Sequence, residues 1–373
     1  MDNHICIFAS TKFQILNALH LTVSKKLFAD LYIIDEGIYK NCRLLASKIE
    51  EEKIFQHVIL INAKKILKFS NSQYVNSFLC YIKYQKIVSS FLLPYKYDIM
   101  LFCTGSLIER LTRFFFIQKN NSNTRFLMYD EGVGSYLDNM EQIHRLGDKI
   151  LRRIIFKKDA SRVVFDKLLY IPELYIHYND PKYGKAYGIP SIDFSKELDI
   201  YNRVYEYQKY FELKEPLILM DFPYKDCFTE TGKRKYEALI KQVAHFEKFE
   251  LVIKKHPSDK SKNELNVKYY DYSEVPFEII IANSDINNKI LLSVFSTATV
   301  TPKIIFNKEP TVIILYKIFQ DDFIKPNNFI CNFFERAKKL YQGDNFYIPE
   351  TQEELFFILN HLKEEIDECQ TQL

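Results

Sequence analysis

The sequence predicts an α/β protein with two domains, each built on a parallel β-sheet. Short apolar runs alternate with longer stretches of helical periodicity along most of the chain, which is the pattern of β-α-β units. A polar, aromatic-rich stretch from about Tyr178 to Glu215 interrupts this alternation. With 373 residues, the chain is long enough for two domains of ordinary size.

The first half of the chain contains the strands of the first predicted sheet. Short apolar runs indicate these strands at His4–Ala9, Ala29–Ile34, Val58–Ile61, Asp98–Cys103, Arg125–Tyr129 and Leu168–Ile171. After the first run, Phe13, Leu16 and Leu19 share one face of a predicted helix. Ser10 or Thr11 can cap the start of that helix. We expect helices on both faces of the sheet.

The second half repeats the pattern after turn signals at Asn179–Pro181 and Gly188–Pro190. Strands are predicted at Pro216–Asp221, Glu250–Ile253, Lys289–Val294 and Thr311–Leu315, with a helix near Lys233–His245. We therefore expect a domain boundary near residue 190. The predicted domains span residues 1–190 and 191–345, and residues 346–373 follow as a helical segment.

The C-terminal segment, Thr351–Leu373, is predicted to form one helix. Thr351 and Glu354 have the T-x-x-E spacing of a capping box. An apolar stripe at helical spacing contains Leu355, Ile358, Leu359, Leu362 and Ile366. We interpret this stripe as a packing face rather than as a site for a partner.

The composition limits the possible classes of protein. Hydrophobic residues make up 47% of the chain and charged residues 27%, so a packed globular protein is expected. The net charge of +3 does not suggest a nucleic-acid partner. No apolar run reaches the roughly 18 residues that span a bilayer, and Met1–Ile5 lacks the basic start of a signal peptide. We therefore expect a cytoplasmic protein.

The seven cysteines predict neither a disulfide framework nor a zinc site. They are odd in number, scattered along the chain and never spaced as C-x-x-C. Cys6 and Cys103 lie in apolar runs, so we interpret them as small core residues. The motifs G-x-G-x-x-G, P-loop, G-x-S-x-G, H-E-x-x-H and D-x-D are missing from the sequence. We expect a protein that requires neither a metal nor another cofactor.

An acidic pair, Asp130-Glu131, follows the predicted strand Arg125–Tyr129 and precedes Gly132. In open α/β sheets ligands bind outside the carboxyl ends of the strands, where a carboxylate can accept a proton from a hydroxyl nucleophile. Gly132 and Gly134 allow a sharp turn and a close approach of substrate. The alternative is an ordinary acidic turn after a strand.

In the second half, His256 follows the predicted strand Glu250–Ile253 and lies between Lys255 and Pro257. A histidine at a strand end can donate a hydrogen bond or a proton to a phosphate oxygen, and the proline restricts the local backbone. The motif is therefore a candidate phosphate contact. The alternative is a histidine in a surface turn.

Two more candidates for ligand contact lie in the second half. Ser296 and Thr297 follow the run Leu291–Phe295, where hydroxyl side chains and backbone N–H groups can bind a phosphate. Glu278 opens a predicted helix after Pro276 and can accept hydrogen bonds from two ribose hydroxyls. The alternatives are a plain helix cap at Ser296 and an acid favoured by the helix dipole at Glu278.

A basic amphipathic stretch spans His144–Lys158. Its basic side chains are Arg145, Lys149, Arg152, Arg153, Lys157 and Lys158. Such a stretch can bind an anionic membrane, which would place the protein at the inner face of the cell membrane. It can equally bind an anionic acceptor, or pack with its basic face in solvent.

Taken in order along the chain, these motifs resemble those of bacterial sialyltransferases. An acid-acid-glycine motif comes first, then His-Pro, then Pro-x-Glu, then a Ser/Thr pair. The opening segment Ala9–Ala18, which contains Ser10, Thr11 and Gln14, is similar to the start of glycosyltransferase family 52. That family includes sialyltransferases of lipooligosaccharide and capsule. The resemblance extends from residue 4 to about residue 315.

The resemblance implies a GT-B fold, which is two Rossmann-like domains facing a central cleft, with the final helix packing back on the N-terminal domain. It implies an inverting, metal-independent transfer of sialic acid from CMP-sialic acid to a galactose-terminated glycan. By position, Asp130 matches the family's general base and His256 the group that stabilises the leaving phosphate. Glu278 matches the ribose contact, and Ser296 and Thr297 match the phosphate contacts.

Other interpretations stay open at this point. A transferase of the same fold that uses another nucleotide sugar is the first alternative, and a non-catalytic glycan- or nucleotide-binding protein is the second. A nucleic-acid-binding module would depend on His144–Lys158 alone. Within the site, Glu131 is the next candidate for the base after Asp130, while Lys255 and Pro257 are expected on the donor side.

Overall fold

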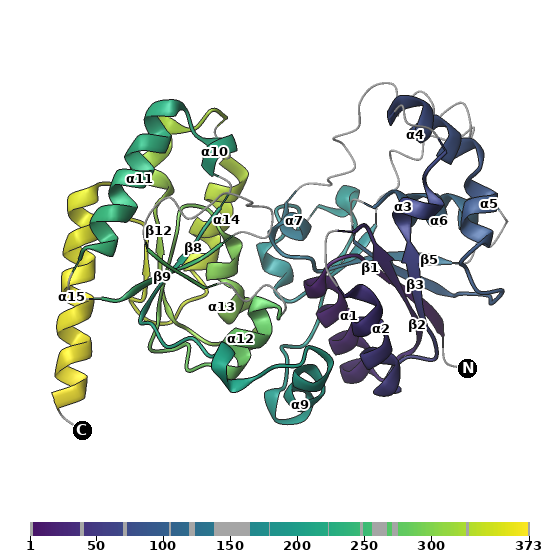
Figure 1. The fold of residues 1–373 in the computed structure, drawn as a ribbon, viewed down its shortest axis with the longest axis horizontal. Helices are drawn as coiled ribbons and strands as arrows, with labels where there is room; N and C mark the ends of the chain where they lie inside the picture. The colour runs from purple at the N-terminus through teal and green to yellow at the C-terminus, as the bar shows by residue number, and fades with distance from the viewer. Residues whose placement is uncertain are drawn as a thin grey trace. The chain divides into compact units, whose positions relative to one another are not determined.

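The computed structural model describes residues 3–37, 41–69, 73–103, 106–118, 124–137, 165–178, 180–222, 224–246, 249–255, 267–270, 275–325 and 328–371. The chain divides into two compact units, Met1–Glu206 and Tyr207–Leu373. Each unit contains one parallel β-sheet with helices on both sides of it (Figure 1). Each is therefore an α/β domain, as the alternation of apolar runs and helical stretches predicts.

The first unit contains a seven-stranded sheet in the order β3-β2-β1-β4-β5-β6-β7. Its strands are β1 (His4–Ala9), β2 (Phe28–Asp35), β3 (Val58–Asn62), β4 (Ile99–Phe102), β5 (Arg125–Tyr129), β6 (Asp166–Leu169) and β7 (Ala186–Gly188). Neighbouring strands in this part of the structure are all parallel. Ile5 of β1 pairs with Ala29 of β2 on one side and with Ile99 of β4 on the other.

Helices connect these strands and cover the sheet. They are α1 (Lys12–Lys25), α2 (Cys42–Glu51), α3 (Ala63–Ile66), α4 (Gln73–Ile82), α5 (Tyr84–Ser89), α6 (Leu107–Gln118), α7 (Val133–Tyr136) and α9 (Phe194–Val204), with the short 3-10 helices η3 (Pro172–Leu174) and η4 (Pro181–Tyr183). α9 packs against α1 and α2, while α5 packs against α4 and α6.

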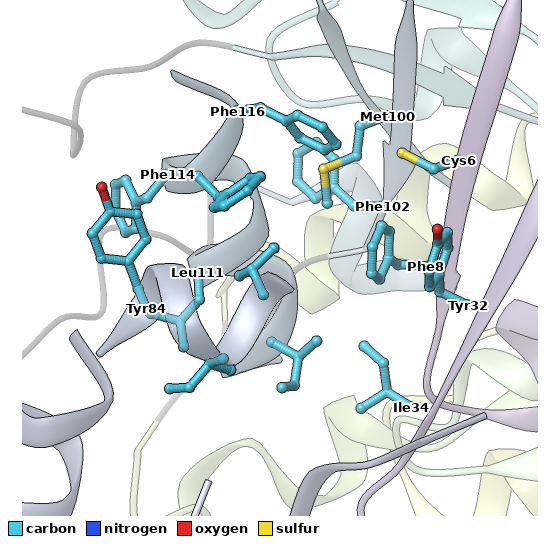
Figure 2. Close-up of a cluster of buried hydrophobic side chains, with 14 of the residues drawn as sticks. Cys6, Phe8, Tyr32, Ile34, Tyr84, Met100, Phe102, Leu111, Phe114 and Phe116 are labelled. Atoms are coloured by element: carbon cyan, nitrogen blue, oxygen red, sulfur yellow. The ribbon is translucent and has the colours of Figure 1, made fainter. Parts of the chain in front are cut away.

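The core beside α5 and α6 is rich in aromatic side chains (Figure 2). Cys6 and Phe8 of β1 belong to it, and the Phe8 ring stacks on Tyr32 of β2 with ring centroids 4.7 Å apart. Because successive side chains of a strand point to opposite faces, Ile5 and Ile7 face away from this core. Both faces of β1 are buried, which explains why the strand reads as a continuous apolar run.

The second unit contains a six-stranded parallel sheet in the order β10-β9-β8-β11-β12-β13. Its strands are β8 (Leu217–Met220), β9 (Leu251–Lys254), β10 (Lys268–Tyr270), β11 (Ile290–Ser293), β12 (Thr311–Ile314) and β13 (Phe346–Tyr347). Its helices are α10 (Tyr224–Cys227), α11 (Glu230–Ala244), α12 (Phe277–Asn283), α13 (Thr301–Phe306), α14 (Asn328–Lys338) and α15 (Gln352–Thr371), with η5 (Lys209–Phe211), η6 (Thr297–Thr299) and η7 (Tyr316–Asp322). In Figure 1 the sheet lies between α11 and α15 on one side and α12 and α13 on the other.

Each strand predicted from an apolar run is present, with ends that shift by at most two residues. The largest shift is at β6, which spans Asp166–Leu169 where Leu168–Ile171 was predicted. The predicted helix near Lys233–His245 is also confirmed, as α11. β7, β10 and β13 were not predicted, because two or three residues are too few for a periodic pattern.

The aromatic-rich stretch after Tyr178 contains β7 and α9, and the first unit extends to Glu206. Buried side chains attach this segment to α1. His20 Nδ1 lies 2.8 Å from a carboxylate oxygen of Glu197, and His20 Nε2 lies 2.8 Å from the carbonyl oxygen of Pro190. These contacts extend the first unit beyond the turn signals near residue 190, where we had expected the boundary.

The C-terminal helix α15 belongs to the second unit. The apolar stripe is buried at Leu355, Ile358, Leu359 and Leu362. The Glu354 N–H donates to Thr351 Oγ1 at 3.1 Å, whereas the Glu354 carboxylate accepts from the backbone of Glu350. Only the threonine half of the predicted capping box is therefore formed. In the described part of the chain, no helix is both long enough and apolar enough to cross a membrane.

Candidate functional site

Each sheet has one point where the strand order reverses, and open α/β sheets bind ligands outside the carboxyl ends of the strands at such a point. In the first sheet the reversal lies between β1 and β4, and β5 is the next neighbour. In the second sheet it lies between β8 and β11. Because all these strands are parallel, the residues that follow them lie along one edge of each sheet.

Asp130 directly follows β5 and is almost fully buried, with 2% of its surface exposed. Its Oδ1 accepts from the backbone N–H of Gly132 at 2.8 Å. Its Oδ2 accepts from the Tyr136 hydroxyl and, at 3.3 Å, from the backbone N–H of Tyr170. Burial raises the pKa of Asp130 to about 6, although these donors oppose the increase. The carboxylate therefore fastens the turn after β5 to the segment after β6.

Gly132 adopts a backbone conformation that only glycine occupies readily. Its φ is 105° and its ψ is −160°. A Cβ atom at this position would meet nothing within 4 Å, so the requirement comes from the backbone and not from space. The turn lets the Glu131 N–H donate to Ser135 Oγ at 2.9 Å. The acidic pair is therefore held by a compact, hydrogen-bonded loop.

Glu131 is half-buried, and the start of α1 holds its carboxylate. Gln14 Nε2 donates to Glu131 Oε2 at 2.9 Å, although the two residues are 117 positions apart in the sequence. The Gln14 Oε1 atom accepts from the backbone N–H groups of Ser10 and Thr11 at 2.7 and 3.3 Å. Thr11 in turn caps α1 by accepting from the Gln14 N–H. The structure thus brings Ser10, Thr11 and Gln14 to the acidic pair.

Two buried polar side chains, those of Asn17 and Tyr170, hold the turn that follows β5 through hydrogen bonds. Asn17 Nδ2 donates to the carbonyl oxygen of Asp130 at 2.7 Å. The Tyr170 hydroxyl donates to Asn17 Oδ1 at 2.8 Å. Sequence reasoning missed both residues, because a single Asn or Tyr within an apolar pattern carries no signal of its own.

A third carboxyl group lies at the same edge. Glu109 of α6 is 2% exposed and accepts from the backbone N–H of Cys103, just after β4, at 3.1 Å. Burial raises the pKa of Glu109 to about 8, and the nearby charge of Glu131 adds to the increase while Arg113 opposes it. Sequence reasoning missed Glu109. Its signal was the S-x-x-E spacing with Ser106 after a predicted strand.

In the second unit, Ser296 and Thr297 follow β11 beside the reversal point. Ser293 Oγ donates to the carbonyl oxygen of Met220, which ends β8, at 2.9 Å. The Ser296 N–H donates to Ser293 Oγ at 2.7 Å. Ser296 and Thr297 are half-buried at the start of η6. Both hydroxyl residues therefore lie at the edge where a ligand of this sheet would bind.

The end of β9 places Lys254 close to the start of α12 and Lys255 close to β10. Lys254 Nζ lies 5.8 Å from the ring centre of Phe277, and Lys255 Nζ lies 4.6 Å from that of Tyr269. Burial raises the pKa of Glu278, and the positive charge of Lys254 opposes the increase. Lys254 and Glu278 are therefore neighbours, although they are 24 positions apart in the sequence.

Some predicted site residues lie outside the described part of the chain. These are His256 and Pro257, together with the basic stretch His144–Lys158. Their assignments stay predictions. Among the residues that the structure describes, no group of three or more His, Cys, Asp or Glu side chains is arranged to hold a metal ion.

Comparison with known proteins supports the fold. No protein-family model matches the chain. No curated protein sequence matches it either. Among solved structures it resembles the UDP-GlcNAc 2-epimerase of Methanocaldococcus jannaschii, with 10% identity, coverage of 97% of this chain and 93% of that chain, and a TM-score of 0.50.

The fold is GT-B. Two parallel α/β domains and the likeness to the epimerase structure confirm this prediction. Weaker likenesses are to apo UGT2 of Phytolacca americana, 7% identical over 98% of this chain and 94% of that chain with a TM-score of 0.45, and to α,α-trehalose-phosphate synthase of Burkholderia vietnamiensis, 8% identical over 100% of both chains with a TM-score of 0.42. At these identities the likeness concerns the fold alone.

Proposed function

We propose that this protein is an inverting glycosyltransferase that moves sialic acid from CMP-sialic acid to a galactose-terminated glycan. The observation that carries the proposal is the oriented acidic pair Asp130-Glu131, which follows β5 at the carboxyl edge of the first sheet, one strand from the reversal point. Ser296, Thr297 and Lys255 at the carboxyl edge of the second sheet add suitable groups for a nucleotide phosphate. The order of the motifs along the chain, which resembles family 52, supports CMP-sialic acid as the donor.

The second unit would bind the donor. Hydroxyl side chains and the backbone at the start of η6 suit a single phosphate, and Glu278 suits the ribose hydroxyls. His256 would stabilise the negative charge that grows on the departing phosphate. A preorganised donor of this kind typically lowers the barrier by about 3 kcal/mol. We expect this set of groups to act without a metal ion.

The first unit would supply the base. A hydroxyl oxygen of the acceptor attacks the anomeric carbon while its proton passes to the acidic pair. The bond from the anomeric carbon to the phosphate oxygen breaks, and CMP leaves with its electrons. Direct displacement from the opposite face inverts the configuration at the anomeric carbon.

Product analysis tests the proposal. The purified protein is incubated with CMP-sialic acid and lactose, and the product is identified by mass spectrometry and by NMR of the new anomeric linkage. We expect a sialylated lactose of inverted configuration. The control is a double variant with Glu131→Gln and Asp130→Ala. The wild-type rates of donor hydrolysis or sugar transfer must exceed those of this variant. An absence of both reactions under saturating donor would refute the assignment.

One comparison suggests UDP-sugars as a second class of donor. The solved structure of the M. jannaschii epimerase holds UDP-GlcNAc and UDP. UDP-hexoses are therefore the alternative donors to measure beside CMP-sialic acid, with the same acceptor. Turnover of a UDP-sugar without turnover of CMP-sialic acid would retain the glycosyltransferase assignment and replace the donor. Donor binding without either reaction would indicate a non-catalytic nucleotide-binding protein.

A further inference from the structure

The side-chain amide of Gln14 has an orientation that its neighbours determine. Its Oε1 atom receives the N–H groups of Ser10 and Thr11 and, at 3.0 Å, the hydroxyl of Ser10. Backbone N–H groups are donors only, so the atom that faces them must be the amide oxygen. The NH₂ group is therefore directed to the other side, where Glu131 Oε2 lies 2.9 Å away.

This arrangement makes one side chain serve two purposes. Gln14 is 5% exposed and completes the capping box of α1 with Thr11. A residue whose rotamer is fixed by a cap and by burial holds its partner in a defined geometry. Glu131 is thereby oriented by a helix of the sheet scaffold rather than by its own loop.

Asp130 has a different environment from Glu131. Both of its oxygens accept hydrogen bonds from Gly132, Tyr136 and Tyr170, and only 2% of its surface is exposed. A general base must come within hydrogen-bond reach of the proton that it removes. The half-buried Glu131 satisfies this requirement better than a carboxylate enclosed by the protein.

We propose that Glu131 is the general base, that Gln14 is the positioning residue that orients its carboxylate, and that Asp130 positions the turn. This inference rests on the proposed function and assigns roles within the same site. The acceptor hydroxyl gives its proton to the Glu131 carboxylate as its oxygen bonds to the anomeric carbon. The departing CMP takes the electrons of the broken bond, so charge and atoms balance.

Gln14→Glu is the informative variant. Glu is the usual residue at this position of a capping box, so the variant should keep the cap and the fold. It places a second carboxylate against Glu131, in a site that also contains Glu109 and Asp130 and the thiol of Cys103. Two adjacent carboxylates cannot both ionise without mutual repulsion, which raises their pKa values above those of the unfolded chain.

A measurement without substrate tests the orientation. Stability that depends on a raised carboxyl pKa is present at low pH and is lost as the pH rises through that pKa. The melting temperature of Gln14→Glu should therefore fall increasingly below that of the wild type between pH 5 and pH 8. Gln85→Glu is the matched control, because it makes the same change on the exposed side of α5, where Gln85 donates to the Tyr84 hydroxyl. A difference that does not grow with pH would overturn the contact between Gln14 and Glu131.

Kinetics with CMP-sialic acid and lactose test the chemical roles. Glu131→Gln should lower kcat by about 10²–10⁴ with the donor KM nearly unchanged. In Gln14→Glu the rising limb of the pH–kcat profile should move to higher pH by about one unit or more. A Glu131→Gln enzyme with wild-type kcat, or a Gln14→Glu profile that coincides with the wild type, overturns the inference and leaves the proposed function standing.

Failure of the proposed function has a different signature. If the wild-type protein transfers no sugar from CMP-sialic acid or from a UDP-hexose, both the proposed function and the assignment of Glu131 as the base are refuted. The pH-dependent loss of melting temperature in Gln14→Glu would then still support the orientation of Glu131 by Gln14. The two measurements therefore separate an error in the site geometry from an error in the reaction.

Discussion

Asp130 and Glu131 are adjacent in sequence, yet substitutions at the two positions should have different effects on activity and stability. Asp130→Ala should lower both kcat and the melting temperature, because Gly132, Tyr136 and Tyr170 lose the acceptor that they share. Each buried donor left without a partner typically costs about 1–3 kcal/mol. Glu131→Gln should lower kcat alone. Differential scanning calorimetry and steady-state kinetics on the two variants compare these effects.

The same two variants would contradict these assignments if Asp130 were the base and Glu131 had the structural role. An Asp130→Ala protein that melts like the wild type, paired with a Glu131→Gln protein that loses stability and retains activity, would return the base to Asp130. That is the assignment that the motif order implies by resemblance.

Glu109 predicts a pH dependence of stability. Burial raises its pKa from the ordinary value of 4.5 to about 8 in the folded protein. Its contribution to stability is therefore complete below about pH 4.5 and is lost as the pH rises toward 8. Glu109→Gln, which cannot ionise, should lose less of its stability than the wild type over this range. Urea unfolding at pH 5, 6, 7 and 8 measures the effect, and parallel curves for the two proteins would contradict it.

At the residue scale, sequence reasoning found the acidic pair and missed most of its supports. Asp130 and Glu131 follow an apolar run, so their position at a strand end was predictable. Gln14 came to notice only through its resemblance to a family segment. Asn17 and Tyr170 could not be found, because their long-range hydrogen bonds leave no periodic trace in the sequence. Glu109 did have a signal, its S-x-x-E spacing with Ser106, which was overlooked.

At the scale of single elements, α11 contains a glycine that its packing requires. Gly→Ala in a helix normally stabilises by about 1 kcal/mol. At Gly232, however, an added Cβ would lie 2.7 Å from Asp322 Cβ and 3.0 Å from the Asp322 carbonyl oxygen. Gly232→Ala should therefore destabilise the protein by about 1–3 kcal/mol. Urea unfolding monitored by circular dichroism measures the change, with Lys241→Ala on the exposed face of α11 as the control.

The attachment of α9 to α1 depends on a buried contact between Glu197 and His20. Glu197 lies 4% exposed against His20 and accepts from the Tyr201 hydroxyl. Glu197→Ala removes the carboxylate that His20 Nδ1 and the Tyr201 hydroxyl contact, and each buried polar group that loses its partner typically costs about 1–3 kcal/mol. The variant should therefore unfold at a lower urea concentration than the wild type. Lys48→Ala is the control, because Lys48 pairs with the exposed Glu206 at the protein surface and surface pairs contribute about 0–1 kcal/mol. Equal effects of the two changes would show that the His20 contact adds no stability.

Element length decided which parts of the fold were predictable. β1 and β2 are six and eight residues long and buried on both faces, so their apolar runs identify them. β13 has two residues and β7 has three, which is below the length of any pattern. α9 was missed for another reason: it lies in a polar, aromatic-rich stretch whose turn signals suggested a connection between domains.

At the scale of the whole molecule, we predict that catalysis is independent of divalent metal ions. A CMP leaving group carries a single phosphate, whose developing charge His256, two hydroxyls and backbone N–H groups can stabilise. Activity with CMP-sialic acid should therefore be unchanged in excess EDTA. Loss of turnover in EDTA, followed by recovery on addition of Mg²⁺ or Mn²⁺, would contradict this prediction.

Two parallel α/β domains were predictable from the whole chain and the GT-B fold from the resemblance, whereas the donor was not predictable. Apolar runs that alternate with helices indicate a parallel sheet because such strands need covered crossovers. A shared fold hosts many activities, so the choice between CMP-sialic acid and a UDP-sugar depends on side chains at the site. Ser296, Thr297 and Glu278 suit a nucleotide of either kind, since phosphate and ribose are common to both.

The parallel strand order of the first sheet also has a consequence for how the chain acquires its structure. β1 is synthesised before β4 and lies in the interior of the sheet, where β4 pairs with it at Ile5 and Ile99. Closing a loop of that length loses chain entropy before the pairing contributes any stability. We therefore expect slow refolding. We also expect that during translation the apolar β1 has no β4 to pair with until β4 emerges from the ribosome. In that period its exposed edge is a target for chaperones or for aggregation.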